Sequence, residues 1–327
     1  MKYRIFKALF IAVSLICCGN VVFAVEKPIS IVELLERLET AERELSFHGH
    51  FTHEHGGTID TFEILRLVVD GVEYEKTSKL TGQEREKVNI GRDTRCLTKS
   101  NHLLRGHHLN LKLGGAVSLE QSYNFYFLGE DRIAGRDSLV IRIEPKDSFR
   151  YGYWLTLDKA SGLIIRSVIT SGKKKALERA QYVFVEEINS TFDPSTYLTV
   201  EELQTIQKNI ERRNSGLSEC NLNVRFTAPW RPSWVPPGFL LTSYTYTDED
   251  GHMETYSDGL GVFSIFIDDF KETHPQRLLA HRGATVALMS QVELPNHLLN
   301  VSVVGEIPLL AAQKISSSIA ESNASEL

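Results

Sequence analysis

The stretch IDTFEILRLVVDGVEYEKTSK, from Ile59 to Lys79, predicts the architecture of much of this 327-residue chain. A long extended run ends at Asp70-Gly71, and a second run begins directly after it. An Asp-Gly pair between two such runs is a strong signal for a β-hairpin, because both residues accept the positive φ that a tight turn requires. We therefore expect a sheet built from consecutive antiparallel strands.

Further extended runs lie on both sides of this hairpin. From Phe47 to Thr52, aromatic residues and glycine alternate with polar residues, which is typical of a strand with one buried face. Short runs with turn residues between them predict an antiparallel meander. The strands are expected at residues 47–52, 59–69, 73–79, 86–90, 94–99, 138–143, 151–157, 163–170 and 180–188.

An amphipathic helix is predicted before the first strand. Ser30 and Glu33 have the spacing of a capping box, in which each side chain bonds to the other residue's backbone N–H. Apolar residues then recur at helical spacing as far as Leu45. A helix of this kind needs an apolar partner, so we expect it to cover one face of the sheet and form a half-barrel or cup.

The composition changes near residue 200, which indicates a second unit. Glu201 to Arg213 is polar and has helical character, and Asn214-Ser215-Gly216 interrupts it. Beyond four prolines, strands are expected at 240–247, 253–256, 261–267, 285–291 and 300–304, and Pro308 suits the first turn of a final helix. We predict an α+β fold with a large antiparallel half-barrel over helices at 25–200, a linker at 201–222 and a smaller antiparallel sheet-and-helix domain at 223–327.

The first 24 residues have the features of a secretory signal peptide. Lys2, Arg4 and Lys7 form a positive region, an apolar run follows, and Val22-Phe23-Ala24 supplies a small-x-small cleavage site. The apolar run is short for a membrane span, which takes about 20 residues. We therefore expect export to the periplasm with cleavage near Ala24.

Charge and cysteine content narrow the classes of partner. The leader carries three positive charges and no negative ones, so its removal changes the formal net charge from -6 to -9. A chain this acidic is not suited to binding nucleic acid through phosphate contacts. Cys96 and Cys220 remain, and in an oxidising compartment they either form a disulfide or stay as buried thiols.

The sequence lacks the phosphate-binding, dinucleotide-binding and serine-nucleophile motifs of common enzymes. Its most enzyme-like feature is His48-Gly-His50 followed by His53-Glu-His55, and histidines two apart on a strand share a face. A metal site and a metal-dependent hydrolase are possible interpretations of this pattern. The favoured interpretation is that these histidines face solvent. We therefore predict no catalytic residue, no metal and no cofactor.

Two groups of aromatic residues are candidate binding sites. The first would line a cleft for acyl chains in the larger unit, with core packing as the alternative, and consists of Phe127, Tyr151, Tyr153 and Trp154. The second would contact a protein partner or the other domain, because rigid proline-rich segments and aromatic anchors are typical of interfaces. It consists of Trp230, Trp234, Pro237, Gly238, Phe239, Tyr256, Ser257, Asp258 and Gly259. For these residues, packing in the core of the second domain is the other interpretation.

Several segments resemble the RseB/MucB family of negative regulators of the envelope-stress sigma factor. They occur in family order over nearly the whole mature chain: Arg132-Ile-Ala-Gly-Arg136, Pro145 to Tyr153, Trp234-Val-Pro-Pro-Gly-Phe239, Tyr256-Ser-Asp-Gly-Leu260 with Phe263-Ser-Ile-Phe266, and Val303-Val-Gly-Glu-Ile-Pro308. The chain departs from the family at Trp154-Leu155-Thr156, and Ser138 lies near the place where some relatives have a cysteine. A disulfide assigned by analogy with those relatives is therefore in doubt.

This resemblance implies a fold and a function. The larger domain would be like the lipoprotein carriers LolA and LolB. The protein would bind the periplasmic part of an RseA/MucA-like membrane anti-sigma factor and shield it from site-one proteolysis. Lipopolysaccharide or lipoprotein acyl chains would release it, without catalysis. The alternative is a periplasmic lipid or lipoprotein carrier of LolA/LolB type, and a homo-oligomer is left open.

Overall fold

The computed structural model describes residues 31–93, 119–215, 229–247, 251–269, 277–295 and 297–321. The expected signal peptide, the Ser30 cap, the strand at 94–99 and both Cys96 and Cys220 lie outside these ranges. None of the helices in the described ranges has the length and apolar character that a bilayer span requires.

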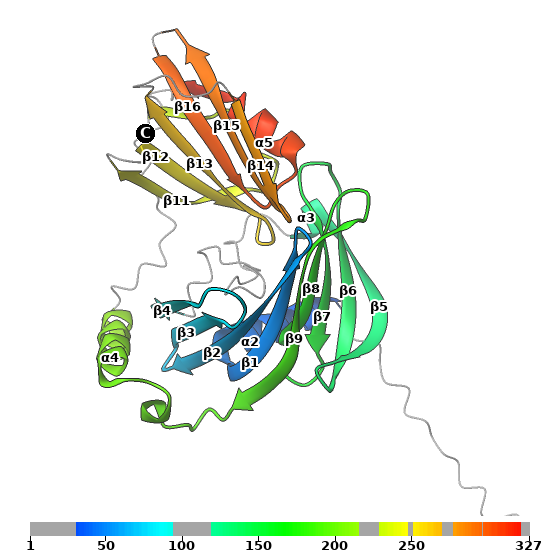
Figure 1. Cartoon of the computed structure of the whole chain (residues 1–327), viewed down its shortest axis with the longest axis vertical. Helices are drawn as coiled ribbons and strands as arrows, with labels where there is room; N and C mark the ends of the chain where they lie inside the picture. Colours follow the sequence, from blue (N-terminus) through cyan, green and yellow to red (C-terminus); the bar gives the residue numbers. More distant parts are fainter. Residues whose placement is uncertain are drawn as a thin grey trace, which may run out of the picture. The chain divides into compact units, whose positions relative to one another are not determined.

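A nine-stranded antiparallel sheet is the largest element (Figure 1), with the strand order β4-β3-β2-β1-β9-β8-β7-β6-β5. The sheet is open, because β4 and β5 form its two edges and do not pair with each other. Its strands are β1 (Ser46–His55), β2 (Thr58–Val69), β3 (Val72–Lys79), β4 (Arg85–Asp93), β5 (Tyr123–Ile133), β6 (Arg136–Pro145), β7 (Gly152–Asp158), β8 (Ile164–Thr170) and β9 (Ala176–Ile188).

The hairpin predicted at Asp70-Gly71 is present. Asp70 and Gly71 have φ values of 48° and 74°, and β2 pairs with β3 so that Val69 lies opposite Val72. Positive φ at both central residues is what a two-residue hairpin turn requires, because it matches the twist of the strands. The local chemistry of this pair therefore sets the register of the two strands.

Side-chain alternation gives the nine-stranded sheet two distinct faces. Phe51, Ile141 and Tyr153 are nearly fully buried on one face, which we call the inner face. The predicted first helix, α2 (Ile31–Glu44), is tied to this face by Arg66. The Arg66 guanidinium pairs with Glu73 at 2.6 Å and donates to backbone carbonyls in the last turn of α2 and just beyond it. A cation at this end of a helix satisfies carbonyl groups that have no partner within the helix.

The opposite face, the outer face, is partly covered by α4 (Val200–Asn214). Ile206 and Ile210 of this helix pack against Leu67, Val72 and Tyr74 of β2 and β3. Part of the segment expected to link the domains is thus a helix that packs on the large sheet. Two shorter helical elements, α3 (Leu119–Ser122) and the 3-10 turn η1 (Pro194–Thr196), complete this part of the chain.

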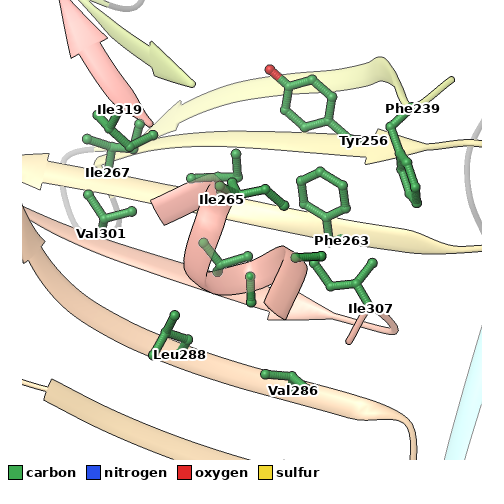
Figure 2. Packing of buried hydrophobic residues seen from close by; sticks show 14 of the residues in the cluster. Phe239, Tyr256, Phe263, Ile265, Ile267, Val286, Leu288, Val301, Ile307 and Ile319 are labelled. Carbon is green, nitrogen blue, oxygen red and sulfur yellow. The ribbon is translucent and has the colours of Figure 1, made fainter. Parts of the chain in front are cut away.

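A six-stranded antiparallel sheet follows, with the order β11-β12-β13-β16-β15-β14. The helix α5 (Leu309–Ser316) lies on one face of it, and Figure 2 shows Phe239, Tyr256 and Phe263 packed beside this helix. The strands are β11 (Leu240–Thr247), β12 (Gly251–Ser257), β13 (Val262–Asp269), β14 (Arg277–Arg282), β15 (Thr285–Leu294) and β16 (His297–Gly305), with a separate pair of β10 (Trp230–Pro232) and β17 (Ile319–Glu321). The predicted α+β class is confirmed.

Candidate functional site

Asp258 is the centre of a buried polar junction between the two sheets. It lies in the turn after β12, and its carboxylate accepts four hydrogen bonds. The Tyr123 hydroxyl and Arg150 Nη1 each donate to Oδ2 at 2.8 Å, and the backbone N–H groups of Leu260 and Gly261 donate to Oδ1 at 3.0 and 2.8 Å. Burial raises the pKa of Asp258, while Arg150 and these donors oppose the rise. A proton on the carboxylate would displace at least one donor, so the geometry favours the ionised form.

Arg150 supplies the opposite charge from the segment between β6 and β7. Its side chain is 1% exposed, as is that of Asp258. Nε also contacts the Asp147 carboxylate at 3.2 Å, and Nη2 donates to the Pro237 carbonyl. The guanidinium lies 5.2 Å from the centroid of the Phe239 ring. The contacts with Asp258, Pro237 and Phe239 join the β6–β7 segment of the large sheet to the Pro237–Phe239 turn and the β12–β13 turn, and the contact with Asp147 holds the guanidinium from within its own segment.

An aromatic contact extends this junction. The Trp234 and Phe149 rings meet edge to face, with centroids 5.0 Å apart. Lys314 Nζ of α5 lies 4.0 Å from the Trp234 ring centroid and 5.0 Å from that of Phe149. A cation over an aromatic face is attracted by the ring quadrupole. Trp234 therefore contacts both Lys314 of α5 and Phe149 of the β6–β7 segment, and its side chain remains half-buried.

A second junction joins the β14–β15 turn to the inner face of the large sheet. Glu178 of β9 is buried, and its Oε2 lies 2.8 Å from His53 Nε2. Its other oxygen accepts the Ala284 N–H at 2.9 Å. Gly283 has φ +60°, and a Cβ at this position would overlap the Glu178 carboxylate. A residue with a Cβ is thus disfavoured here, both by the backbone conformation and by the close approach of the Glu178 carboxylate.

A cavity of about 510 Å³ lies beside this second junction. Its volume is within the range of small-molecule sites. Charged and imidazole side chains predominate in its lining, which contains Phe51, His53, His55, Asp60, Phe62, Thr77, Lys79, Arg85, Glu86, Lys87, Glu178, Arg282 and Thr285. Side chains of both charge signs contribute to the lining, and the rings of Phe51 and Phe62 supply apolar surface beside them.

The predicted partner-binding residues divide by exposure. Trp230, Phe239 and Tyr256 are buried in the core of the six-stranded sheet, and Ser257, Asp258 and Gly259 are buried in the adjoining turn. Pro237 is exposed, and Trp234 and Gly238 are half-buried. The structure thus brings eight of the nine into one region around the Asp258 turn, whereas Trp230 contacts His252 and His297 at the far ends of β12 and β16. Only the three at the Trp234–Gly238 turn present surface to a separate molecule.

The predicted lipid-cleft residues do not share one surface. Tyr153 and Phe127 lie on the inner face, because they pair across the strands with Ile143 and Ile141. Tyr153 is 1% exposed and Phe127 is 45% exposed, at the β5 edge. Tyr151 is buried just before β7, and Trp154 points from the outer face with 41% exposure. None of the four lines the 510 Å³ cavity.

The four histidines of β1 also divide between the faces. His48 and His50 are half-buried on the outer face, as solvent-side residues, but His53 and His55 are 3% and 4% exposed on the inner face. The surface interpretation was therefore wrong for His53 and His55. Their odd positions place them on the same face as Phe47 and Phe51, so strict alternation already contained the signal. Among the described residues, His48, His50 and Glu63 are grouped closely enough to hold a metal ion.

Sequence reasoning did not single out Arg150 and Glu178. Their neighbours in the sequence are partly polar, so no local pattern marked either residue as buried. Arg150 lies in the family segment Pro145 to Tyr153, and Glu178 lies at a position of β9 that faces inward. Their partners are 108 and 106 positions away along the chain.

The fold and the junctions define a two-sheet α+β protein in which buried ion pairs and turns connect the sheets. The model of the MucB/RseB N-terminal domain matches residues 30–205, and that of the MucB/RseB C-terminal domain matches residues 225–320. The chain therefore belongs to the MucB/RseB family.

Relatives and solved structures agree with this assignment. The sigma factor AlgU regulatory protein MucB of Pseudomonas aeruginosa is 30% identical over 293 residues, which cover 87% of this chain and 89% of that protein. The sigma-E factor regulatory protein RseB of Escherichia coli is 23% identical over 330 residues, covering 96% and 98%. A crystal structure of MucB in complex with MucA(peri) matches with a TM-score of 0.68 and 27% identity, over 90% of this chain and all of that one. These relatives are named as regulatory proteins.

Proposed function

We propose that this protein binds the periplasmic part of a membrane anti-sigma factor and shields it from site-one proteolysis. The match of both family domains to the MucB chain of a complex with MucA(peri) carries the proposal. That chain is similar over its whole length, which supports a shared mode of binding. The protein acts by binding and not as an enzyme.

The proposed location is the periplasm, after cleavage near Ala24. The features of the leader and the regulatory relatives support this location. We propose two domains, at 25–200 and 223–327, with the segment 201–222 between them. The two buried junctions hold these domains in a defined arrangement, which a partner that contacts both of them would need.

The proposed partner surface is centred on the Trp234–Gly238 turn. Trp234 and Pro237 offer a ring and a rigid backbone to a partner, and such residues are typical interface anchors. The buried members of the predicted set, such as Phe239 and Asp258, would not contact the partner. They position the turn through their contacts with Arg150. This division assigns contact to the exposed residues and support to the buried ones.

Release by a lipid signal is the second part of the proposal. Phe127 and Tyr153 share the inner face near the β5 edge, and the exposed ring of Phe127 offers apolar surface there. The Tyr153 hydroxyl is buried and has no hydrogen-bond partner among the described residues. An acyl chain would cover the exposed ring of Phe127, whereas the Tyr153 hydroxyl is closed off from solvent. Tyr151 borders this region, and Trp154 lies on the opposite face.

Two experiments on the mature, full-length protein test this function. Binding of the soluble periplasmic segment of the cognate anti-sigma factor is measured by titration, and its cleavage by the site-one protease is followed with and without the protein. We expect complex formation and slower cleavage. If the segment binds but is cleaved at the same rate, the shielding role is wrong, and if it does not bind, the proposed function is wrong. Lipopolysaccharide added to the complex should release the segment.

A further inference from the structure

Three polar side chains gather on the outer face of the large sheet, where β1 pairs with β2. His48 and His50 are two positions apart on β1, so they point to the same side. Glu63 of β2 lies directly opposite His50 in the antiparallel register. Its Oε1 atom is 2.8 Å from His48 Nε2 and 3.7 Å from His50 Nε2. A single carboxylate oxygen is therefore shared by two imidazoles.

These distances match the dimensions of a transition-metal site. The ligand atoms of all three residues lie within 4.8 Å of one another. Zinc binds His nitrogen at about 2.0–2.1 Å and carboxylate oxygen at about 2.0–2.2 Å in tetrahedral geometry, which places neighbouring ligand atoms about 3.3–3.5 Å apart. The observed separations of 2.8 and 3.7 Å lie on either side of this value. Binding of one ion by all three atoms would require side-chain rotations that bring them to this spacing.

We propose that His48, His50 and Glu63 form a zinc-binding site on the outer face of the large sheet. Two imidazoles and one carboxylate are a donor set that zinc takes at sites with an open position. Imidazole also selects against magnesium and calcium, which prefer oxygen ligands. The three side chains are 31%, 33% and 42% exposed, so an ion reaches them without opening the fold.

The strand on the other side of β1 adds to the site. Glu186 of β9 lies directly opposite His48, and Phe184 lies opposite His50. Cross-strand neighbours have Cβ atoms about 4.5–5.5 Å apart, so a rotation of the exposed Glu186 side chain brings its carboxylate to the open position. The centroid of the Phe184 ring lies 6.1 Å from that of the His48 imidazole and 5.8 Å from that of the His50 imidazole, so the ring is a neighbour of both. The site thus has a fourth ligand within reach and an apolar neighbour.

The position of the site gives it a structural consequence. A bound ion would connect β1 to β2 through Glu63 and to β9 through Glu186. Leu65, which lies opposite His48, packs against the cluster that α4 forms with the outer face. Zinc would therefore stabilise the central strands beside the α4 contact. The site lies on the face opposite to the 510 Å³ cavity, so its occupancy and ligand binding in the cavity are separate events.

The test uses the mature full-length protein from which any affinity tag has been removed. Zinc is titrated into metal-free protein by calorimetry, and Mg²⁺ is titrated in parallel. We expect one high-affinity zinc ion per chain at this site, no response to Mg²⁺, and a melting temperature that rises by several degrees in excess zinc, because a ligand that binds only the folded state stabilises it. Cobalt should give the visible absorption bands of a tetrahedral complex.

Variants locate the ion. His48→Gln, His50→Gln and Glu63→Gln should each weaken zinc binding at least tenfold and remove the rise in melting temperature, and Glu186→Gln should weaken it less. His281→Gln changes an exposed histidine on β14 and should bind zinc like the parent protein. Circular dichroism without metal checks that the variants are folded. Absence of zinc binding in the parent, or binding that persists unchanged in His50→Gln and Glu63→Gln, would overturn the proposal.

Discussion

Arg150 Nη1 donates a 2.8 Å hydrogen bond to Asp258 Oδ2, and both side chains are 1% exposed although 108 positions separate them. Charges this deeply buried are stable only when each has its partner, because desolvation penalises an isolated charge strongly. The junction between the two sheets therefore depends on this pair. Substitution of one partner and substitution of both should change the free energy of unfolding by different amounts.

We expect Asp258→Asn to lower the free energy of unfolding by about 3–5 kcal/mol, because it leaves the Arg150 charge buried and unpaired. The double variant Arg150→Met/Asp258→Asn should be more stable than the sum of its single variants predicts. Urea denaturation of the four proteins gives the coupling energy. The control is Arg179→Met, which breaks an ion pair with Glu54 whose side chains are 50% and 49% exposed, and should cost less than about 1 kcal/mol. Additive effects at Arg150 and Asp258 would contradict the role of the pair.

The β14–β15 turn gives a second prediction. Gly283→Ala introduces a Cβ that overlaps the Glu178 carboxylate at a residue with φ +60°. Gly82→Ala is the matched control, because Gly82 has φ +70° and no atom within 4 Å of an added Cβ. The control should cost about 1 kcal/mol for backbone conformation alone, and Gly283→Ala should cost clearly more. Equal losses in thermal melts would mean that the turn does not rest on Glu178.

We predict that the stability of the fold depends on pH because Glu254 is buried. Its side chain is fully buried in the six-stranded sheet, Tyr256 donates to it at 2.6 Å, and burial raises its pKa from 4.5 to about 7. A raised carboxyl pKa means that the folded state holds the proton more tightly than the unfolded state does. Stability from this group is therefore complete below pH 4.5, falls as the pH rises toward 7 and is constant above that.

The shift corresponds to about 3 kcal/mol. Glu254→Gln should remove this dependence, so the variant should gain stability relative to the parent between pH 5 and pH 8. Denaturant unfolding of both proteins at these two pH values measures the difference. Parallel pH profiles for the two proteins would show that Glu254 does not titrate in this range.

Trp234 tests the proposed partner surface. Trp234→Ala removes a half-buried ring, and we expect it to weaken binding of the anti-sigma segment by about 2 kcal/mol or more while the protein stays folded. Trp230→Ala is the contrast, because Trp230 is buried in the core, and its loss should cost about 3–5 kcal/mol of stability. A melt and a binding titration on each variant separate the two effects. If the Trp234→Ala melting temperature falls in step with its binding, Trp234 is a core residue.

The redox state of the two cysteines of the mature chain can be tested directly in solution. If Cys96 and Cys220 are bridged, labelling of the unfolded, unreduced protein should find no free thiol. A bridge that closes a loop of this size stabilises by about 4–5 kcal/mol in the chain-entropy model, so reduction should lower the melting temperature. Two labelled thiols per chain would show that the cysteines are free.

Local elements were largely predictable from the sequence. The first helix, the Asp70-Gly71 hairpin and the final helix after Pro308 were expected and are present. The missed strands are β5 and β14, at the sheet edges, and the short strands β10 and β17, which pair with each other. In β5 a bulge between Phe127 and Gly129 breaks the alternation, and exposed residues such as Leu128 hide its buried face. A period of two is recognisable only where one face is consistently buried.

The family was recognisable from segments that resemble its members, and the family models match both parts of the chain. The α+β class and the order of most elements followed from hydrophobic period and turn chemistry, which depend on near neighbours. Which distant residues meet is a property of the folded chain. The tertiary structure placed Arg150 on Asp258 and Glu178 on the Ala284 N–H. Such contacts depend on strand order and on the angle at which two sheets meet. Many chain segments contribute to both, and no local pattern specifies either one.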